Sequence, residues 1–207
     1  QMQRYNQKYY SLYKTRYLLL LALNYNYSGN SDEASAILDE LVPKKGKINF
    51  REKGHLQAVL ARAVIHFQQE QFIEAKQMIA LLRQQDSVYI ESLGLEWLIN
   101  KKFIEILIAI ELDNTDYADS LISSLRRKRT VYFTGASALA LPFLKLIEAY
   151  HKKPQHVKSK EFEEQVESAF DWKPSEEEDL FFISYYAWLK SKMIGQPVYE
   201  ITLSFLK

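Results

Sequence analysis

The stretch Gly29-Asn-Ser-Asp-Glu-Ala34 places a polar turn directly before an alanine, and two later stretches repeat this arrangement. They are Gln69-Glu-Gln-Phe-Ile-Glu-Ala75 and Asp113-Asn-Thr-Asp-Tyr-Ala118, so the alanines lie 41 and 43 residues apart. An apolar stripe at helical spacing follows each alanine: Ile37, Leu38 and Leu41; Met78, Ile79 and Leu82; Leu121, Ile122 and Leu125. This period predicts an all-α protein built from stacked antiparallel helix pairs.

The composition favours helix and excludes several kinds of site. The chain has 207 residues, is 47% hydrophobic, and contains only 6 Gly and 5 Pro. These proportions allow a sizeable core and make helix the default over most of the length. A net charge of +1 makes nucleic acid an unexpected partner, and the absence of Cys removes disulfides, thiolate catalysis and cysteine zinc sites.

The sequence says less about the cellular compartment and about what lies beyond the ends of the chain. A chain without Cys suits the cytoplasm and the periplasm alike, and we favour the cytoplasm. The longest apolar run, 18–23, is too short to span a bilayer. Because the chain starts at Gln1 rather than Met, we expect a piece of a longer protein.

The pattern divides the chain into one domain of five helical repeats, at about 4–43, 52–85, 92–129, 136–170 and 175–207. Within them we expect helices over 3–27, 52–69, 72–84, 92–112, 116–128, 136–151, 158–170 and 175–193, with a helix that ends at Pro43 after a cap at Asn30 or Ser31. The triplets Ile48-Asn-Phe50, Val88-Tyr-Ile90 and Val131-Tyr-Phe133 are expected as linkers that share the period.

The first repeat resembles the tetratricopeptide pattern, in which helix A carries a large apolar, a small and an aromatic residue, and helix B opens on alanine. The residues that carry the resemblance are Leu18, Leu21, Ala22, Tyr25, Ala34, Leu38 and Leu41. The second repeat fits less well and the third has Ile106 at the small position, so its two helices should lie farther apart. The period also exceeds the family's value of about 34 residues. The resemblance implies a right-handed solenoid that binds extended peptides or protein surfaces.

Members of that family usually bind ligands on the inner face of their A helices. By resemblance, this inner face holds Arg16, Leu19, Leu23, Asn26, Gln57, Leu60, Val64, Phe67, Asn100, Phe103, Leu107 and Ile110. Such a groove would be mostly apolar and suited to an amphipathic helix, and it lacks the Lys/Asn clamp that some members use. The alternative is that the C-terminal helices cover this face. The residues leave both interpretations open.

A second candidate surface is a stripe of tyrosines. Tyr5, Tyr9, Tyr13 and Tyr17 recur at a spacing of four, which places them along one face of a helix. They could form a rigid aromatic surface for a partner. We favour ordinary packing on the first repeat, and a docking place for a further repeat is a third interpretation.

Catalytic and metal signals are weak. Gly135-Ala-Ser137 faintly resembles a nucleophile elbow but lacks the second glycine, and the pairs His55/His66 and His151/His156 have no carboxylate at ligand spacing. The basic clusters at 44–47, 126–129 and 152–153 are attributed to helix ends rather than to phosphate binding. We therefore expect no cofactor, no metal and no catalysis.

We interpret the chain as a protein-interaction module or scaffold whose partner is a protein or peptide, with a homodimer as a further possibility. The alternative is an effector-sensing or oligomerisation domain of a regulator that has a DNA-binding domain upstream. A helical enzyme is the most remote interpretation.

Overall fold

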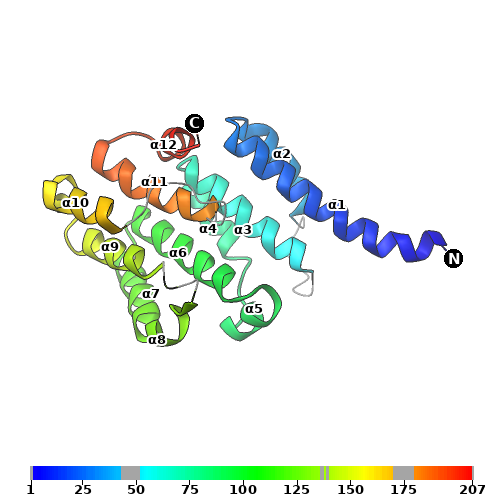
Figure 1. The fold of residues 1–207 in the computed structure, drawn as a ribbon, viewed down its shortest axis with the longest axis horizontal. Helices are drawn as coiled ribbons and strands as arrows, with labels where there is room; N and C mark the ends of the chain where they lie inside the picture. The colour runs from blue at the N-terminus through cyan, green and yellow to red at the C-terminus, as the bar shows by residue number, and fades with distance from the viewer. Residues whose placement is uncertain (1, 43–51, 136–137, 139, 170–179, 207) are drawn as a thin grey trace.

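The computed structural model describes residues 2–42, 52–135, 138, 140–169 and 180–206, with side chains except those of residues 2–12, 180 and 182. Over these ranges every regular element is a helix (Figure 1). The elements are α1 (Met2–Tyr27), α2 (Ser31–Leu41), α3 (Lys53–Gln68), α4 (Phe72–Ile79), α5 (Asp86–Leu93), α6 (Leu95–Glu111), α7 (Thr115–Arg127), α8 (Arg129–Tyr132), α9 (Ala140–Lys152), a 3-10 helix η2 (Pro154–Lys158), α10 (Lys160–Ala169), α11 (Leu180–Ile194) and α12 (Val198–Ser204).

Three turns share one backbone geometry and create the pairs α1/α2, α3/α4 and α6/α7. Each turn has one residue with positive φ, namely Gly29 (88°), Glu70 (59°) and Asp113 (53°). The next amide in each turn donates to a carbonyl five residues back: Asn30 to Tyr25, Gln71 to His66 and Asn114 to Ala109, at 2.9 Å each. This is the hydrogen bond that closes a helix in the Schellman motif, so one local structure recurs with the sequence period.

The repeated alanines lie where two helices of a pair approach closely. Ala34, Ala75 and Ala118 are fully buried, with 0% of their surface exposed. Their amides continue helix B by bonding to Asn30, Gln71 and Asn114 respectively. A methyl group allows the helices to approach without a void, which explains the residue type at this position.

The pairs follow one another in space as well as in sequence. Helix α2 packs on α3 and α4 packs on α6, so the second helix of one pair contacts the first helix of the next. Helix α9 lies beside α7, joined by Arg126–Glu148 at 3.1 Å and His151–Asp119 at 3.2 Å. Figure 1 shows α1 and α2 at one end of the molecule and α9 and α10 at the other.

The last two helices return to the middle of the molecule. Helix α11 packs on α3 and α6, and α12 packs on α11 and α3. Phe143 of α9 stacks on Tyr185 of α11 with ring centroids 5.7 Å apart, and Phe103 of α6 meets Phe143 edge-on at 5.1 Å. Tyr185 and Trp188 are both fully buried, so α11 belongs to the core.

Most expected helices agree with the structure, and two do not. The residues 92–112 were expected as one helix, but Gly94 adopts φ 92° and divides α5 from α6. The expected linker Val88-Tyr-Ile90 is therefore helical, as part of α5, and Val131-Tyr132 belongs to α8. Helix 72–84 is shorter than expected, because Leu81 and Leu82 bond only three residues back, to Met78 and Ile79. The triplet Ile48-Asn-Phe50 lies outside the described residues.

Candidate functional site

The inner face expected to bind a partner is largely buried beneath α11. Five of the predicted contact residues on α3 and α6 are at most 5% exposed: Leu60, Val64, Phe67, Asn100 and Phe103. Tyr185 of α11 donates to the backbone oxygen of Asn100 at 2.9 Å, and its ring lies edge-on to Phe103 at 6.1 Å. Of the two interpretations left open by the sequence, the structure shows the one in which C-terminal helices cover this face.

The other predicted contact residues are scattered. Leu19 and Leu23 of α1 are partly buried against the core residues of α2 and α3, such as Leu38 and Ala58, and Gln57 is exposed. Tyr13 is 66% exposed. The side chains of Tyr5 and Tyr9 lie outside the described residues. The predicted residues therefore do not form one open groove in this conformation.

Consecutive hydrogen bonds between buried polar side chains connect α11 to the first two helix pairs. Asn26, which was predicted to contact a partner, donates from Nδ2 to Gln68 Oε1 at 2.7 Å. Gln68 Nε2 then donates to Ser184 Oγ at 2.6 Å. All three residues are at most 1% exposed, and Tyr199 of α12 donates to the backbone oxygen of Asn26 at 2.6 Å. Asn26 is thus a structural residue that joins α1, α3 and α12.

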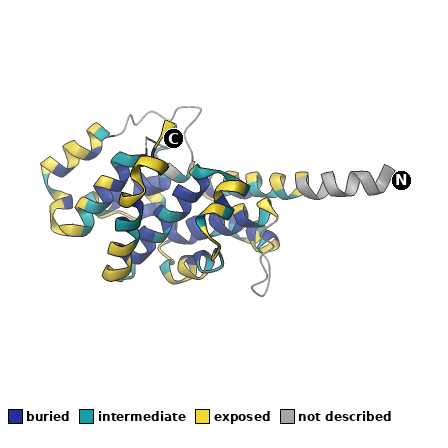
Figure 2. Cartoon of the chain, turned by 90° about the horizontal axis from the view of Figure 1, so that it is seen from below, coloured by how far each residue is buried: buried dark blue, intermediate teal, exposed yellow. Residues whose placement is uncertain are grey.

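One face of α1 is exposed instead. Tyr13, Tyr17 and Leu20 are 66%, 62% and 60% exposed, and their spacing of four and three places them on one side of the helix. We call these three residues the outer face of α1. Figure 2 shows exposed residues along this part of α1, away from the buried middle of the molecule.

In the later repeats, the positions equivalent to Tyr17 and Leu20 of the outer face of α1 are buried. A shift of 41 residues carries Tyr17 and Leu20 to Ala58 and Ala61 of α3, which are fully buried against α1 and α2. A further shift of 43 carries Leu20 to Ile104 of α6, also fully buried. In α3 and α6 this face packs on the preceding helix pair, and in the described structure no helix pair lies against it in α1.

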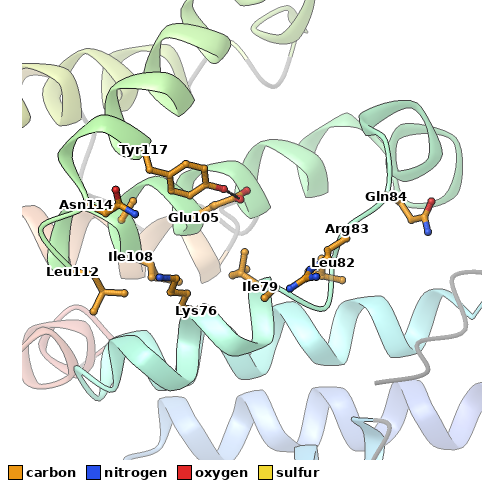
Figure 3. A pocket seen from close by; sticks show the side chains of 12 residues that line it. Lys76, Ile79, Leu82, Arg83, Gln84, Glu105, Ile108, Leu112, Asn114 and Tyr117 are labelled. Atoms are coloured by element: carbon orange, nitrogen blue, oxygen red, sulfur yellow. Dashed lines mark hydrogen bonds between the residues drawn. The ribbon is translucent and has the colours of Figure 1, made fainter. Parts of the chain in front are cut away.

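A cavity of about 510 Å³ lies between α4, α6 and the start of α7 (Figure 3). Its apolar lining consists of Ile79, Ala80, Leu82, Ile108, Ala109 and Leu112. Its polar lining consists of Lys76, Arg83, Gln84, Glu105, Asn114 and Tyr117. Apolar walls with a few polar groups at the edge are typical of small-molecule sites.

A hydrogen-bonded group forms one wall of the cavity. Tyr117 of α7 donates to Glu105 Oε1 at 2.5 Å, and Lys101 Nζ lies 2.7 Å from Glu105 Oε2. Figure 3 shows the Tyr117 ring reaching across to Glu105. Burial and the neighbouring Glu105 carboxylate raise the pKa of Tyr117 well above its ordinary value, so its hydroxyl stays protonated and donates. Lys101 thereby compensates the charge of Glu105, and both partners of this carboxylate belong to its own helix pair.

His55 and His66 of α3, which the sequence analysis considered as a pair of ligands, contact different partners. His66 Nδ1 contacts Gln71 Oε1 at 2.6 Å in the α3/α4 turn, where burial lowers the pKa of the ring, and His55 contacts Glu52 at 3.1 Å. In the described part of the chain no three His, Asp or Glu side chains are grouped as metal ligands. Ser137 and the basic cluster at 44–47 lie outside the described residues.

The second basic cluster is partly neutralised. Arg126 pairs with Glu148 at 3.1 Å, and Lys128 pairs with Asp86 at 2.9 Å. Both cations tie α7 and the turn after it to neighbouring helices. This agrees with a structural role at a helix end.

Among the helices described here, none combines the length and the apolar character needed to cross a membrane. Compared with protein-family models, with curated proteins and with solved structures, the chain matches none of them.

Proposed function

We propose that this chain is a non-enzymatic protein-interaction module that binds a helix of a partner protein on the outer face of α1. We also propose that its helix pairs form a right-handed superhelix of the tetratricopeptide kind, which the three equivalent turns support. The observation that carries the binding proposal is the exposure of Tyr17 and Leu20, at positions that are buried by a helix pair in α3.

The form of the partner follows from the repeat. In α3 the equivalent face packs on residues such as Leu38 and Leu41 of α2, which present an apolar stripe beside a small residue, Ala34. A partner helix with apolar residues at spacings of three and four would complete the same packing on α1. Two tyrosines and a leucine provide rigid, largely apolar contact area at low entropic cost.

Charge specifies the partner further. Residues 1–31 contain four cations, Arg4, Lys8, Lys14 and Arg16, and no Asp or Glu. Lys14 and Arg16 are exposed, and among the described residues neither forms an ion pair. An acidic amphipathic helix therefore complements α1 better than a neutral or basic one.

Binding on the inner face requires a larger change. A partner there would have to displace α11, which would break the contact of Gln68 with Ser184 and unpack the buried rings of Tyr185 and Trp188. Docking on α1 requires no such rearrangement. We therefore place the partner on α1, and binding at the inner face stays a prediction that depends on movement of α11.

Site-specific photocrosslinking tests the proposal. A benzophenone amino acid is placed at Tyr17 and, as the matched control, at Val131, which is 67% exposed on α8. Both proteins are irradiated in a lysate of the cells that make the protein, and crosslinked peptides are identified by mass spectrometry. We expect Tyr17 alone to capture a defined acidic helical segment.

A triple charge substitution provides the second arm. Tyr13→Glu, Tyr17→Glu and Leu20→Glu change only exposed side chains, so circular dichroism should show an unchanged helical spectrum. The crosslinked segment, made as a peptide, should lose most of its affinity for this variant. Equal capture from Tyr17 and Val131, or unchanged affinity, would exclude the outer face of α1 as the binding surface. Crosslinking between two copies of the chain would identify the partner as a second copy.

The second candidate is an effector-sensing domain of a regulator. The cavity between α4, α6 and α7 favours it, because a regulator of this kind requires a ligand site and the lining suits one. An upstream DNA-binding segment in the complete protein would distinguish this candidate from a scaffold.

A further inference from the structure

The interface between the first and second helix pairs and the interface between the second and third pairs carry different residues at two equivalent positions. In the first interface Asp39 of α2 pairs with Arg62 of α3 at 3.1 Å. The shifts of 41 and 43 residues that relate the pairs carry Asp39 to Ala80 and Arg62 to Glu105. The second interface thus has a methyl group where the first has a carboxylate, and the cavity lies there.

Glu105 does not bridge the second interface. Its two carboxylate oxygens are held by Lys101, one turn earlier on α6, and by Tyr117 of α7. Both partners belong to the same helix pair as Glu105, so no ion pair crosses from α4 at this point, as far as the described residues show. The cavity of about 510 Å³ lies at the equivalent place in the second interface, since Ala80 and Glu105 both line it.

We propose that this cavity binds a small organic anion that has an apolar body and one or two acidic groups. The apolar body would lie against Ile79, Ile108 and Leu112, on the walls formed by α4 and α6. The volume falls in the range of about 300 to 1,000 Å³ found for small-molecule sites, and it is too small for a packed helix. The proposal is independent of partner binding on α1.

Two cationic side chains on the rim of the cavity are the reason for proposing an acidic group on the ligand. Lys76 and Arg83 both line the cavity from the α4 side, and Figure 3 shows them along the same edge. Both are exposed, and neither takes part in any ion pair between described residues. Because Lys101 already compensates Glu105, the charge that faces a ligand is positive. An Arg and a Lys at the mouth of an apolar cavity favour a carboxylate, sulfonate or phosphate group.

Fluorescence titration with two matched dyes tests the inference. The probe 8-anilinonaphthalene-1-sulfonate has an apolar ring system and one sulfonate, and N-phenyl-1-naphthylamine has the same rings without the charge. We expect the sulfonate to bind the wild-type chain at one saturable site. The neutral dye should bind more weakly, because it makes no contact with Lys76 or Arg83.

Two variants locate the site. Lys76→Gln with Arg83→Gln removes the cations and should weaken sulfonate binding about tenfold or more, with less than about a twofold change for the neutral dye. Ala80→Trp fills the cavity and should abolish the binding of both dyes. The control is Arg127→Gln with Lys145→Gln, two exposed cations outside the cavity lining, which should leave both affinities unchanged.

Each possible result of these titrations either supports or overturns the proposal. Loss of sulfonate binding in the charge variant but not in the control supports the proposal, provided that circular dichroism shows equal helicity in all three proteins. Sulfonate binding that is absent, not saturable, or unaffected by Lys76→Gln with Arg83→Gln overturns it. If Ala80→Trp does not fold, the charge variant and its control decide the result. The triple Glu variant of α1 should bind the sulfonate normally, which separates this proposal from partner docking.

Discussion

Gln68 and Ser184 are 116 residues apart in the chain, and Gln68 Nε2 donates to Ser184 Oγ at 2.6 Å in the fully buried centre of the molecule. This hydrogen bond joins α3 to α11 and places the C-terminal helices over the inner face. Because Gln68 also accepts from Asn26 at 2.7 Å, one side chain connects three helices. The contact of α11 with the inner face is therefore part of the buried core of the molecule.

Removing this connection should lower the stability of the whole domain. Gln68→Leu leaves the Asn26 Nδ2 donor and the Ser184 Oγ acceptor without that partner, so we expect a loss of about 1–3 kcal/mol in the free energy of unfolding. Urea denaturation followed by circular dichroism measures it. Gln77→Leu, at an exposed position on α4, is the control and should change stability little. Equal midpoints for the two variants would contradict the role assigned to Gln68.

The close approach of paired helices at the repeated alanine can be tested within one helix. Ala34→Asp would bury a carboxylate at a position with 0% exposure, so we expect a loss of about 3 kcal/mol or more. Ala36→Asp, two residues later and exposed, should stay within about 0.5 kcal/mol of wild type. Thermal melting of both variants measures the difference. A cooperative melt of Ala34→Asp at the wild-type temperature would count against this packing.

The turn geometry predicts a stabilising substitution. Asp113 has φ 53°, in the left-handed region, and it is exposed at the end of α6, where a negative charge also opposes the helix dipole. Asp113→Gly should raise the free energy of unfolding by about 0.5–1 kcal/mol, because glycine adopts this φ without strain. Gly29→Ala, at φ 88°, should lower it by about 1 kcal/mol.

The variant Asp113→Asn separates the two contributions. It removes the charge and keeps a side chain at the same backbone conformation, so its stability should lie between those of wild type and Asp113→Gly. Urea denaturation at low salt measures all three proteins. A decrease in stability for Asp113→Gly would show that the aspartate makes a contact that outweighs its backbone strain.

The tie between α5 and α8 predicts a dependence on pH. Burial disfavours the charged form of Asp86, but hydrogen bonds from Lys128, Lys102 and Tyr132 outweigh it and lower the pKa of this carboxylate from its ordinary value to about 2. A lowered pKa in the folded state contributes stability that is fully present above about pH 4 and is lost as the pH falls towards 2.

Asp86→Asn should therefore remove part of the acid sensitivity of the domain. We expect it to lower stability by about 1–2 kcal/mol at pH 7 and by much less at pH 2. Urea midpoints measured from pH 2 to pH 7 check this expectation. Asp116→Asn, at an exposed position on α7, is the control. A pH-independent difference between Asp86→Asn and wild type would show that the ion pairs are not the cause.

The sequence by itself determined the helices and their pairing. Polar turns before Ala34, Ala75 and Ala118, with apolar stripes after them, predicted three hairpins whose turns proved equivalent in their hydrogen bonds. These features are local, because helix capping, turn conformation and amphipathic spacing depend on residues within a few positions. The break at Gly94 was missed, since an isolated glycine inside a helical pattern is often tolerated. The differences at Ala80 and Glu105 could have been found by aligning the repeats on their period.

Only the tertiary structure decided which surfaces are available. Helical periodicity places Leu60 and Phe103 on one face of the A helices, but it does not say whether solvent, a partner or the chain itself covers that face. The contacts of α11 with α3 and α6 join residues more than eighty positions apart in the chain, and they arise from the packing of aromatic rings and from hydrogen bonds of buried polar groups. Such long-range complementarity leaves no periodic signal in the sequence, so the covered inner face, the exposed outer face of α1 and the cavity beside Ala80 became visible only in three dimensions.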